Sequence, residues 1–142
     1  MADFKQAFIQ LNFNEGKYVN DPDDSGGETY KGISRDKNPK WKGWAIIDSL
    51  RKQVGFPDSL GSNLELPVLH EHFFNLEYWF PMKGNSITSQ SVALSIFDFG
   101  ANVGIVTSIQ FAQNVVGTHA DVHSISSGHN TTTGLLPERK WL

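Results

Sequence analysis

Residues 16–40 interrupt a chain whose apolar side chains otherwise recur at helical spacing. This stretch is rich in glycine, aspartate, asparagine and proline, which favour turns because glycine permits a positive φ and proline cannot continue a helix. A short hairpin through Thr29–Ser34 is the regular structure that it predicts. The chain is therefore expected to form helices around one loop-rich segment.

Apolar residues three and four positions apart predict helices on both sides of that segment. The expected helices cover residues 3–14, 43–54, 67–80, a segment from Ser86–Thr88 to Gly104, and residues 106–116. Asp3 is a suitable N-cap for the first helix. Pro67 suits the first position of the third helix, and Pro81 is expected to end that helix. One face of that third helix is expected to carry Leu69, Phe73, Leu76 and Phe80. The predicted fold class is mainly α, a helical bundle with one short β-hairpin.

Composition excludes several classes of function. The chain has 12 basic and 15 acidic residues, a net charge of -3 and no basic block, so no nucleic-acid partner is expected. Its 142 residues include no cysteine, which leaves no disulfides and no cysteine-bound zinc. His70 and His72 lie two positions apart on an expected helix and point in different directions, so they are expected at the surface rather than on a metal. No cofactor is expected.

The hydropathy pattern bears on localisation. The first residues lack the basic and apolar regions of a signal peptide, and no run of about 18 apolar residues occurs. We therefore expect a protein that has no integral membrane segment and is made in the cytoplasm without a signal peptide.

Glu15 and the acidic turn after it are the strongest candidates for chemistry. Glu15 follows the first expected helix one turn after Leu11, and Asp21, Asp23 and Asp24 follow in the turn. Glycoside hydrolysis uses two carboxyl groups, one protonated and one ionised. The apolar neighbours of Glu15 favour its protonated form, whereas a wetter loop keeps Asp21 or Asp24 ionised.

The rest of the turn fits the same chemistry. Gly26 and Gly27 allow the backbone to approach a sugar, and Thr29 is placed to hold a water or a hydroxyl opposite Glu15. On the pattern alone, however, these residues fit a solvated acidic turn equally well. They do not complete an EF-hand calcium loop, because the twelfth place from Asp21 is not a glutamate.

The segment from Glu15 to Ile33 resembles the signature of glycoside hydrolase family 108, written loosely as E-G-G-Y-x-N-D-P-x-D-x-G-G-x-T-x-x-G-I. The chain departs from it at Lys17, where the family has a second glycine. Later motifs are also similar: Tyr78-Trp79-x-Pro81, the run Gln90–Gly104 (QSVALSIFDFGANVG), and Ala112-Gln113 with Val116-Gly117. The resemblance covers roughly residues 4–121.

The resemblance implies a lysozyme-like α+β fold and an N-acetylmuramidase that cleaves the β-1,4 bond between N-acetylmuramic acid and N-acetylglucosamine in peptidoglycan. It places the catalytic acid on Glu15. The Glu, Asp, Thr order of phage-type lysozymes nominates Asp24 and Thr29 as further catalytic residues, with Asp21 as the rival of Asp24. It also implies a muramidase domain over residues 1–86 and a peptidoglycan-binding segment over residues 87–142, truncated or altered after about residue 121.

Aromatic side chains supply candidate contacts to sugar rings. The predicted substrate-binding residues are Tyr18, Gly27, Tyr30, Trp41 and Trp79. Trp41, in a polar context, is expected to be an exposed platform, whereas Trp79 follows an apolar helix face and fits core packing better.

Peptidoglycan strands are the expected partner, met in the periplasm or at the cell wall after export by a holin or another helper. The alternative is a non-catalytic wall-binding or secretion-accessory module of the same fold, which Lys17 and the altered tail favour.

Overall fold

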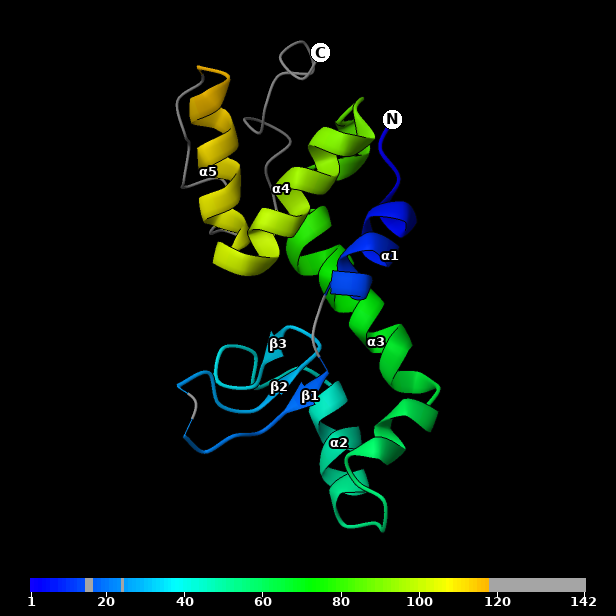
Figure 1. Ribbon diagram of the computed structural model, residues 1–142. Coiled ribbons are helices and arrows are strands. Elements are labelled where there is room, and N and C mark those ends of the chain that lie inside the picture. The colour runs from blue at the N-terminus through cyan, green and yellow to red at the C-terminus, as the bar shows by residue number, and fades with distance from the viewer. Residues whose placement is uncertain (15–16, 24, 118–142) are drawn as a thin grey trace. The chain divides into compact units, whose positions relative to one another are not determined.

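The computed structural model of the protein describes residues 1–14, 17–23 and 25–117 (Figure 1). The chain packs as two compact units: unit 1 is Met1–Leu11 with Phe74–Leu142, and unit 2 is Asn12–Phe73. Helix α1, Phe4–Asn14, begins in unit 1 and ends in unit 2. The predictions on Glu15, on Asp24 and on the tail after residue 117 lie outside the described residues. The division at residue 86 rests on the family resemblance and stays a prediction.

The loop-rich part of unit 2 contains a three-stranded antiparallel sheet in the order β1-β2-β3 (Figure 1). The strands are β1 (Tyr18–Val19), β2 (Thr29–Tyr30) and β3 (Ile33–Ser34). Tyr18 pairs with Tyr30, which in turn pairs with Ile33. The predicted hairpin is confirmed. Strand β1 is an additional strand, which pairs with β2 across the acidic turn and not through a short local turn as β3 does.

A two-residue turn joins β2 to β3 and explains a buried histidine. Lys31 and Gly32 have φ values of 41° and 85°, the left-handed conformation that a type I′ hairpin turn requires. His70 donates from Nε2 to the carbonyl oxygen of Lys31 at 2.8 Å and is 2% exposed. The predicted surface position of His70 is therefore wrong, because the ring satisfies a buried carbonyl of the turn.

The helices of unit 2 are α2 (Gly43–Arg51), the 3-10 helix η1 (Asp58–Ser62) and α3 (Glu65–Phe74), whose last residue belongs to unit 1. Helix α3 begins two residues before Pro67, because Oδ1 of Asn63 accepts hydrogen bonds from the amides of Glu65 and Leu66 at 3.0 and 2.9 Å. Pro67 thus lies in the first turn, where its missing N–H is not needed. No helix in the described ranges combines the length and apolar character that crossing a membrane requires.

Helix α3 is followed by the π turn η2, Asn75–Trp79. Its characteristic hydrogen bond joins the Phe80 amide to the Asn75 carbonyl five residues earlier, at 2.8 Å. The wider turn changes which side chains are buried: Trp79 is 2% exposed, whereas Leu76 and Phe80 are 49% and 73% exposed. The predicted apolar face is therefore wrong at Leu76 and Phe80, because it assumed an uninterrupted α-helix.

Aromatic rings form the core of unit 1. Phe97 of α4 (Gln90–Val103) lies at the centre, with ring centroids 6.0 Å from Phe4, 5.6 Å from Trp79 and 6.2 Å from Phe74. Phe8 of α1 stacks on Phe4 at 5.5 Å. Together these rings tie α1, η2 and α4 into one core.

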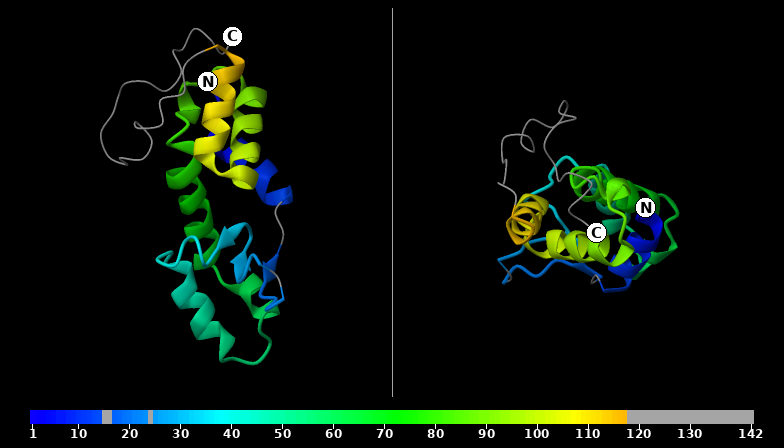
Figure 2. Two further views of the ribbon diagram at one scale, coloured as in Figure 1. Left: turned by 90° about the vertical axis from the view of Figure 1, so that its left-hand side faces the viewer. Right: turned by 90° about the horizontal axis from the view of Figure 1, so that it is seen from above.

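The ends of the unit 1 helices follow from their capping residues. Asp3 caps α1, as predicted, by accepting a hydrogen bond from the Gln6 amide at 2.9 Å. Ser89 caps α4 through the Val92 amide at 3.3 Å. Gly104, with φ of 92°, ends α4, and α5 (Ile105–Val115) returns beside it (Figure 2). The predicted helical bundle with a short hairpin is thus confirmed.

Gly84 allows Trp79 to pack against the 3-10 helix η3 (Gly84–Ser86). A Cβ at Gly84 would lie 2.2 Å from Cε2 of the buried indole, whose Nε1 is held by Asn85 Oδ1 at 2.8 Å. We expect Gly84→Ala to lower the free energy of unfolding by about 1–3 kcal/mol, because the ring has no room to move. Urea titration measures this change.

Gly61→Ala is the matched control, since Gly61 also lies in a 3-10 helix but has open space around its Cβ position. We expect it to change the free energy of unfolding by less than about 1 kcal/mol. Equal losses in the two variants would contradict the packing explanation.

Candidate active site

The acidic turn connects β1 to β2 in unit 2. Asp21 is exposed, and its Oδ1 accepts a hydrogen bond from the Asp23 amide at 2.9 Å. This contact is an Asx turn, which asparagine forms as well as aspartate. The turn therefore needs the oxygen of Asp21 but not its charge.

Of the four predicted catalytic residues, the structure describes Asp21 and Thr29, while Glu15 and Asp24 lie outside the described ranges. Thr29 is half-buried in β2, and its Oγ1 donates to the carbonyl oxygen of Gly27 at 3.4 Å. This long hydrogen bond holds the threonine against the end of the acidic turn. Lys17, the departure from the family signature, is exposed.

Gly27 lies where the turn re-enters the sheet, and no other residue fits there without strain. Its φ is 63°, in the left-handed region. A Cβ at this position would lie 2.8 Å from Oδ2 of Asp36, in the segment that follows β3. The glycine thus brings the carboxylate of Asp36 against the backbone of the turn, a neighbour that the sequence did not indicate.

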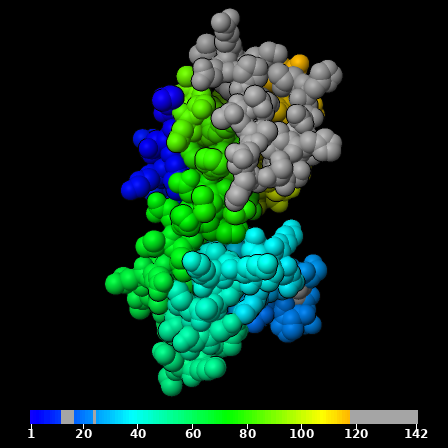
Figure 3. All heavy atoms as spheres, turned by 180° about the vertical axis from the view of Figure 1, so that it is seen from behind, coloured from blue at the N-terminus to red at the C-terminus, as the bar shows by residue number. Residues whose placement is uncertain are grey.

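Five polar side chains, here called the Glu28 cluster, join the sheet to α2: Tyr18, Glu28, Arg35, Asp48 and Arg51. Glu28 accepts from the Tyr18 hydroxyl and from Arg35 Nη1, each at 2.9 Å, and also from Arg51 Nη2. Arg35 binds Asp48 through two hydrogen bonds of 2.7 and 2.6 Å. Figure 3 shows the segment that carries Arg35, Asp48 and Arg51 at the surface of unit 2. Glu28 is more covered, with 11% of its side chain exposed.

The charges of this cluster are fixed at neutral pH. Burial alone would raise the pKa of Glu28, but its hydrogen bonds from two guanidinium groups and one phenol outweigh burial and lower it. The hydrogen bonds from Arg35 lower the pKa of Asp48 to about 2. Burial, followed by the hydrogen bond to Glu28, raises the pKa of Tyr18. Glu28 is therefore an ionised structural carboxylate and cannot serve as a general acid.

Trp41, the predicted sugar platform, belongs to a cluster of aromatic rings. Tyr30 is 4% exposed and stacks on the Trp41 ring, with centroids 5.6 Å apart. The edges of Trp44 and Phe73 approach the Trp41 ring at 5.2 and 6.4 Å. These rings cover part of Trp41, which is intermediate in exposure, and its role as a platform for sugar stays a prediction. Burial also raises the pKa of Tyr30.

The other predicted substrate-binding residues have structural contacts as well. Trp79 lies in the aromatic core of unit 1, which agrees with the packing role preferred for it. Tyr18 directs its hydroxyl to Glu28, and its ring packs edge-on against Phe56 at 5.2 Å. Gly27 contacts Asp36, as described above. Each of these residues thus makes contacts within the protein.

Sequence reasoning missed the Glu28 cluster and Asp36. Glu28 lies inside the signature segment, between Gly27 and Thr29, but at a position that the signature leaves variable. Asp48 and Arg51 are spaced three residues apart on α2, a weak sign of an ion pair on one helix face. In the described part of the chain, no three histidine or acidic side chains gather as metal ligands would.

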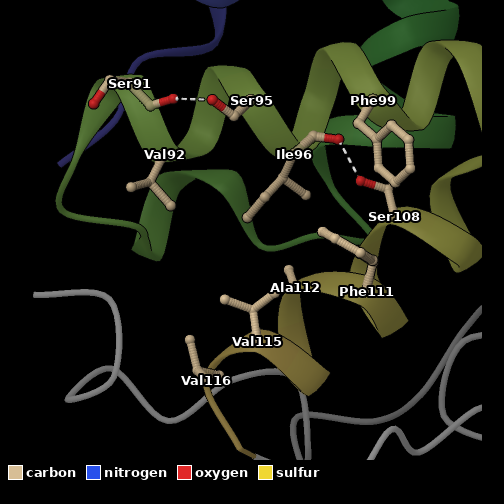
Figure 4. Close-up of a pocket in the computed structure, with 10 residues that line it drawn as sticks. All are labelled: Ser91, Val92, Ser95, Ile96, Phe99, Ser108, Phe111, Ala112, Val115 and Val116. Atoms are coloured by element: carbon tan, nitrogen blue, oxygen red, sulfur yellow. Dashed lines mark hydrogen bonds between the residues drawn. The ribbon is translucent and has the colours of Figure 1, made fainter.

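An apolar groove lies in unit 1 between α4 and α5 (Figure 4). Its volume is about 330 Å³, and its lining includes Val92, Ile96, Phe99, Phe111 and Ala112 with three serines. None of the lining side chains is an acid or a base. The groove therefore offers no group for hydrolysis, and the acidic turn of unit 2 remains the candidate site.

The helices and the small antiparallel sheet beside the acidic turn agree with a lysozyme-like α+β fold. The chain belongs to the glycosyl hydrolase 108 family, whose model matches residues 10–104. This match includes the whole segment from Glu15 to Ile33. The chain is therefore a member of a family of glycoside hydrolases. The resemblance described above implies that peptidoglycan is the substrate of this family.

A solved structure, that of Brucella abortus SagA, has the same fold. It is 22% identical in sequence, with a TM-score of 0.55, and the alignment covers 84% of this chain. The same alignment covers 62% of the SagA chain, so this protein spans less than two thirds of it. The comparison with curated protein sequences found no match.

Proposed function

We propose that the protein is an N-acetylmuramidase that hydrolyses the β-1,4 bond between N-acetylmuramic acid and N-acetylglucosamine, with Glu15 as the general acid. The observation that carries this proposal is the family match, which spans the signature segment from Glu15 to Ile33. Helix α1 ends at Asn14, so Glu15 follows the last helical residue in the chain. The partial negative charge at a helix C-terminus favours the protonated form of a nearby carboxyl group, as a general acid requires.

The second carboxylate is assigned to Asp24. Asp21, its rival, already has a role in the Asx turn that asparagine would fill equally well. Glu28 is bound by two arginines and is not available for the reaction. An ionised Asp24 would stabilise the oxocarbenium-like transition state or position the attacking water. Thr29, at the end of the turn, would hold that water or a substrate hydroxyl. The protein would meet its substrate in the periplasm or at the cell wall, after export by a holin or a similar helper.

Product analysis on purified peptidoglycan tests this function. We expect new reducing ends to accumulate with time, and borohydride reduction should convert them to muramitol, because a muramidase leaves N-acetylmuramic acid at the reducing end. Heat-inactivated protein is the control. Glucosaminitol as the product would contradict the assigned bond. Binding to sacculi without any new reducing ends would instead support the non-catalytic wall-binding module.

A further inference from the structure

The acidic turn has two ends, and both lie beside one side chain of α2. The turn leaves β1 after Tyr18–Val19 and re-enters the sheet at Glu28 and β2. Backbone pairing of Val19 with Thr29 brings the two ends together. Each strand contributes two residues, so the backbone ladder alone fixes little of the turn's geometry.

Arg51 contacts the side chains at both ends. Its Nη1 donates to the Tyr18 hydroxyl at 3.1 Å, and its Nη2 donates to Glu28. The Tyr18 hydroxyl in turn donates to the same Glu28 oxygen at 2.9 Å, which closes a triangle of hydrogen bonds. The Arg51 guanidinium also lies over the Phe56 ring at 5.3 Å, and Tyr18 packs against the edge of that ring.

Arg35 provides a natural comparison within the Glu28 cluster. It binds Glu28 and Asp48, as Arg51 does, and lies over the Trp44 ring at 5.2 Å. Its hydrogen bonds reach the far end of the turn, at Glu28, whereas those of Arg51 reach Tyr18 as well. Because guanidinium is a planar fork, it can hold two acceptors at a fixed spacing, which the single ammonium of lysine cannot do.

We propose that Arg51 is a positioning residue for Glu15. By binding Tyr18 and Glu28 together, it fixes the spacing between the two ends of the acidic turn. Tyr18 is three residues after Glu15 in the sequence, and Lys17–Val19 are the described residues that follow the proposed acid most directly. Tyr18 is thereby a positioning residue too, rather than a contact to sugar. This inference rests on the proposed function.

Steady-state kinetics on peptidoglycan fragments tests the inference with Arg51→Lys, Tyr18→Phe and Arg35→Lys. We expect Arg51→Lys to lower kcat about tenfold and leave KM within about twofold, because a misplaced acid slows the chemical step more than binding. Tyr18→Phe, which removes one oxygen and keeps the ring on Phe56, should lower kcat in the same way. The double variant should lose little more than either single variant, because both changes break one contact.

Arg35→Lys is the matched control. It also breaks hydrogen bonds to Glu28 and Asp48, so its thermal unfolding temperature should fall as far as that of Arg51→Lys, while kcat stays within about threefold of wild type. Amide hydrogen exchange should quicken over residues 17–19 in Arg51→Lys and Tyr18→Phe but not in Arg35→Lys.

Three outcomes separate this inference from the proposed function. A wild-type kcat in Arg51→Lys or Tyr18→Phe, with Glu15→Gln inactive, overturns the positioning role alone. Equal losses of kcat in Arg35→Lys and Arg51→Lys also overturn it, since the effect would then be one of general stability. Undiminished cleavage by Glu15→Gln overturns both the proposed acid and its positioning residue.

Discussion

Replacing Glu15 with glutamine is expected to lower the rate of peptidoglycan cleavage about 10²–10⁴-fold. Glutamine has nearly the shape of protonated glutamate but cannot give a proton to the leaving oxygen. The glycosidic oxygen must then leave as an alkoxide, which raises the barrier of the step. Substrate binding does not require that proton, so KM should change little. Release of reducing ends from purified sacculi measures the loss.

Glu77→Gln is a control for the same chemical change outside the candidate site, because Glu77 is exposed in η2. We expect wild-type activity from it. The thermal unfolding temperatures of both variants should match that of the wild type. A Glu15→Gln enzyme that cleaves at the wild-type rate would remove Glu15 from the mechanism.

Replacing aspartate with asparagine at each position distinguishes Asp21 from Asp24 as the second carboxylate. Asp21→Asn keeps the side-chain oxygen that accepts from the Asp23 amide, so the turn and the activity should both survive. Asp24→Asn removes the charge proposed to stabilise the transition state, and we expect it to lower kcat strongly. The reverse order of effects would make Asp21 the second carboxylate.

Acidification is expected to destabilise the protein through His70. Burial lowers the pKa of His70 to about 4, against 6.5 for an exposed histidine. The unfolded chain therefore takes up a proton at higher pH than the folded chain does. Stability is complete above pH 6.5 and is lost as pH falls toward 4. The full loss corresponds to about 3 kcal/mol, of which about 2 kcal/mol should be lost between pH 7.5 and pH 5.

Urea titrations at pH 7.5 and pH 5 measure this effect in a window where most carboxylates stay ionised. The stability that comes from the low pKa of Asp48, about 2, is lost only at lower pH. His70→Gln keeps a donor for the Lys31 carbonyl and should lose much less stability over that window. His72→Gln, at an exposed position of the same helix, should behave like wild type. An unchanged pH dependence in His70→Gln would contradict the role of this buried ring.

The sequence predicted those parts of the fold that depend on local patterns. Helical spacing located the helices, and the turn-forming residues located the hairpin. Asp3 was assigned to its cap because a cap is a local contact. Strand β1 was missed because it pairs with β2 across the whole acidic turn, and no local turn signal joins the two. The packing of Trp41 against other rings was not predicted, because a polar flank says nothing about which rings from other parts of the chain approach it.

The parts of the candidate site that were missed depend on contacts distant in sequence. Arg51 and Tyr18 are 33 residues apart, and His70 and Lys31 are 39 residues apart. Such pairs form only once the sheet and the helices have packed, so no local sequence pattern indicates them. The motif nominated Glu15 as the acid, and that role stays a proposal. The side chains that hold the motif in place came from the structure.

The π turn at Asn75–Trp79 sets a limit on insertions and deletions. Each residue of an α-helix advances the direction of its side chain by about 100°, so one added residue rotates every later side chain by that angle. Deleting one residue from this turn would restore a regular helix and direct Trp79 away from the aromatic core. The length of the segment thus determines which residue is buried. Related chains of different length are therefore expected to place their gaps in the loops and not here.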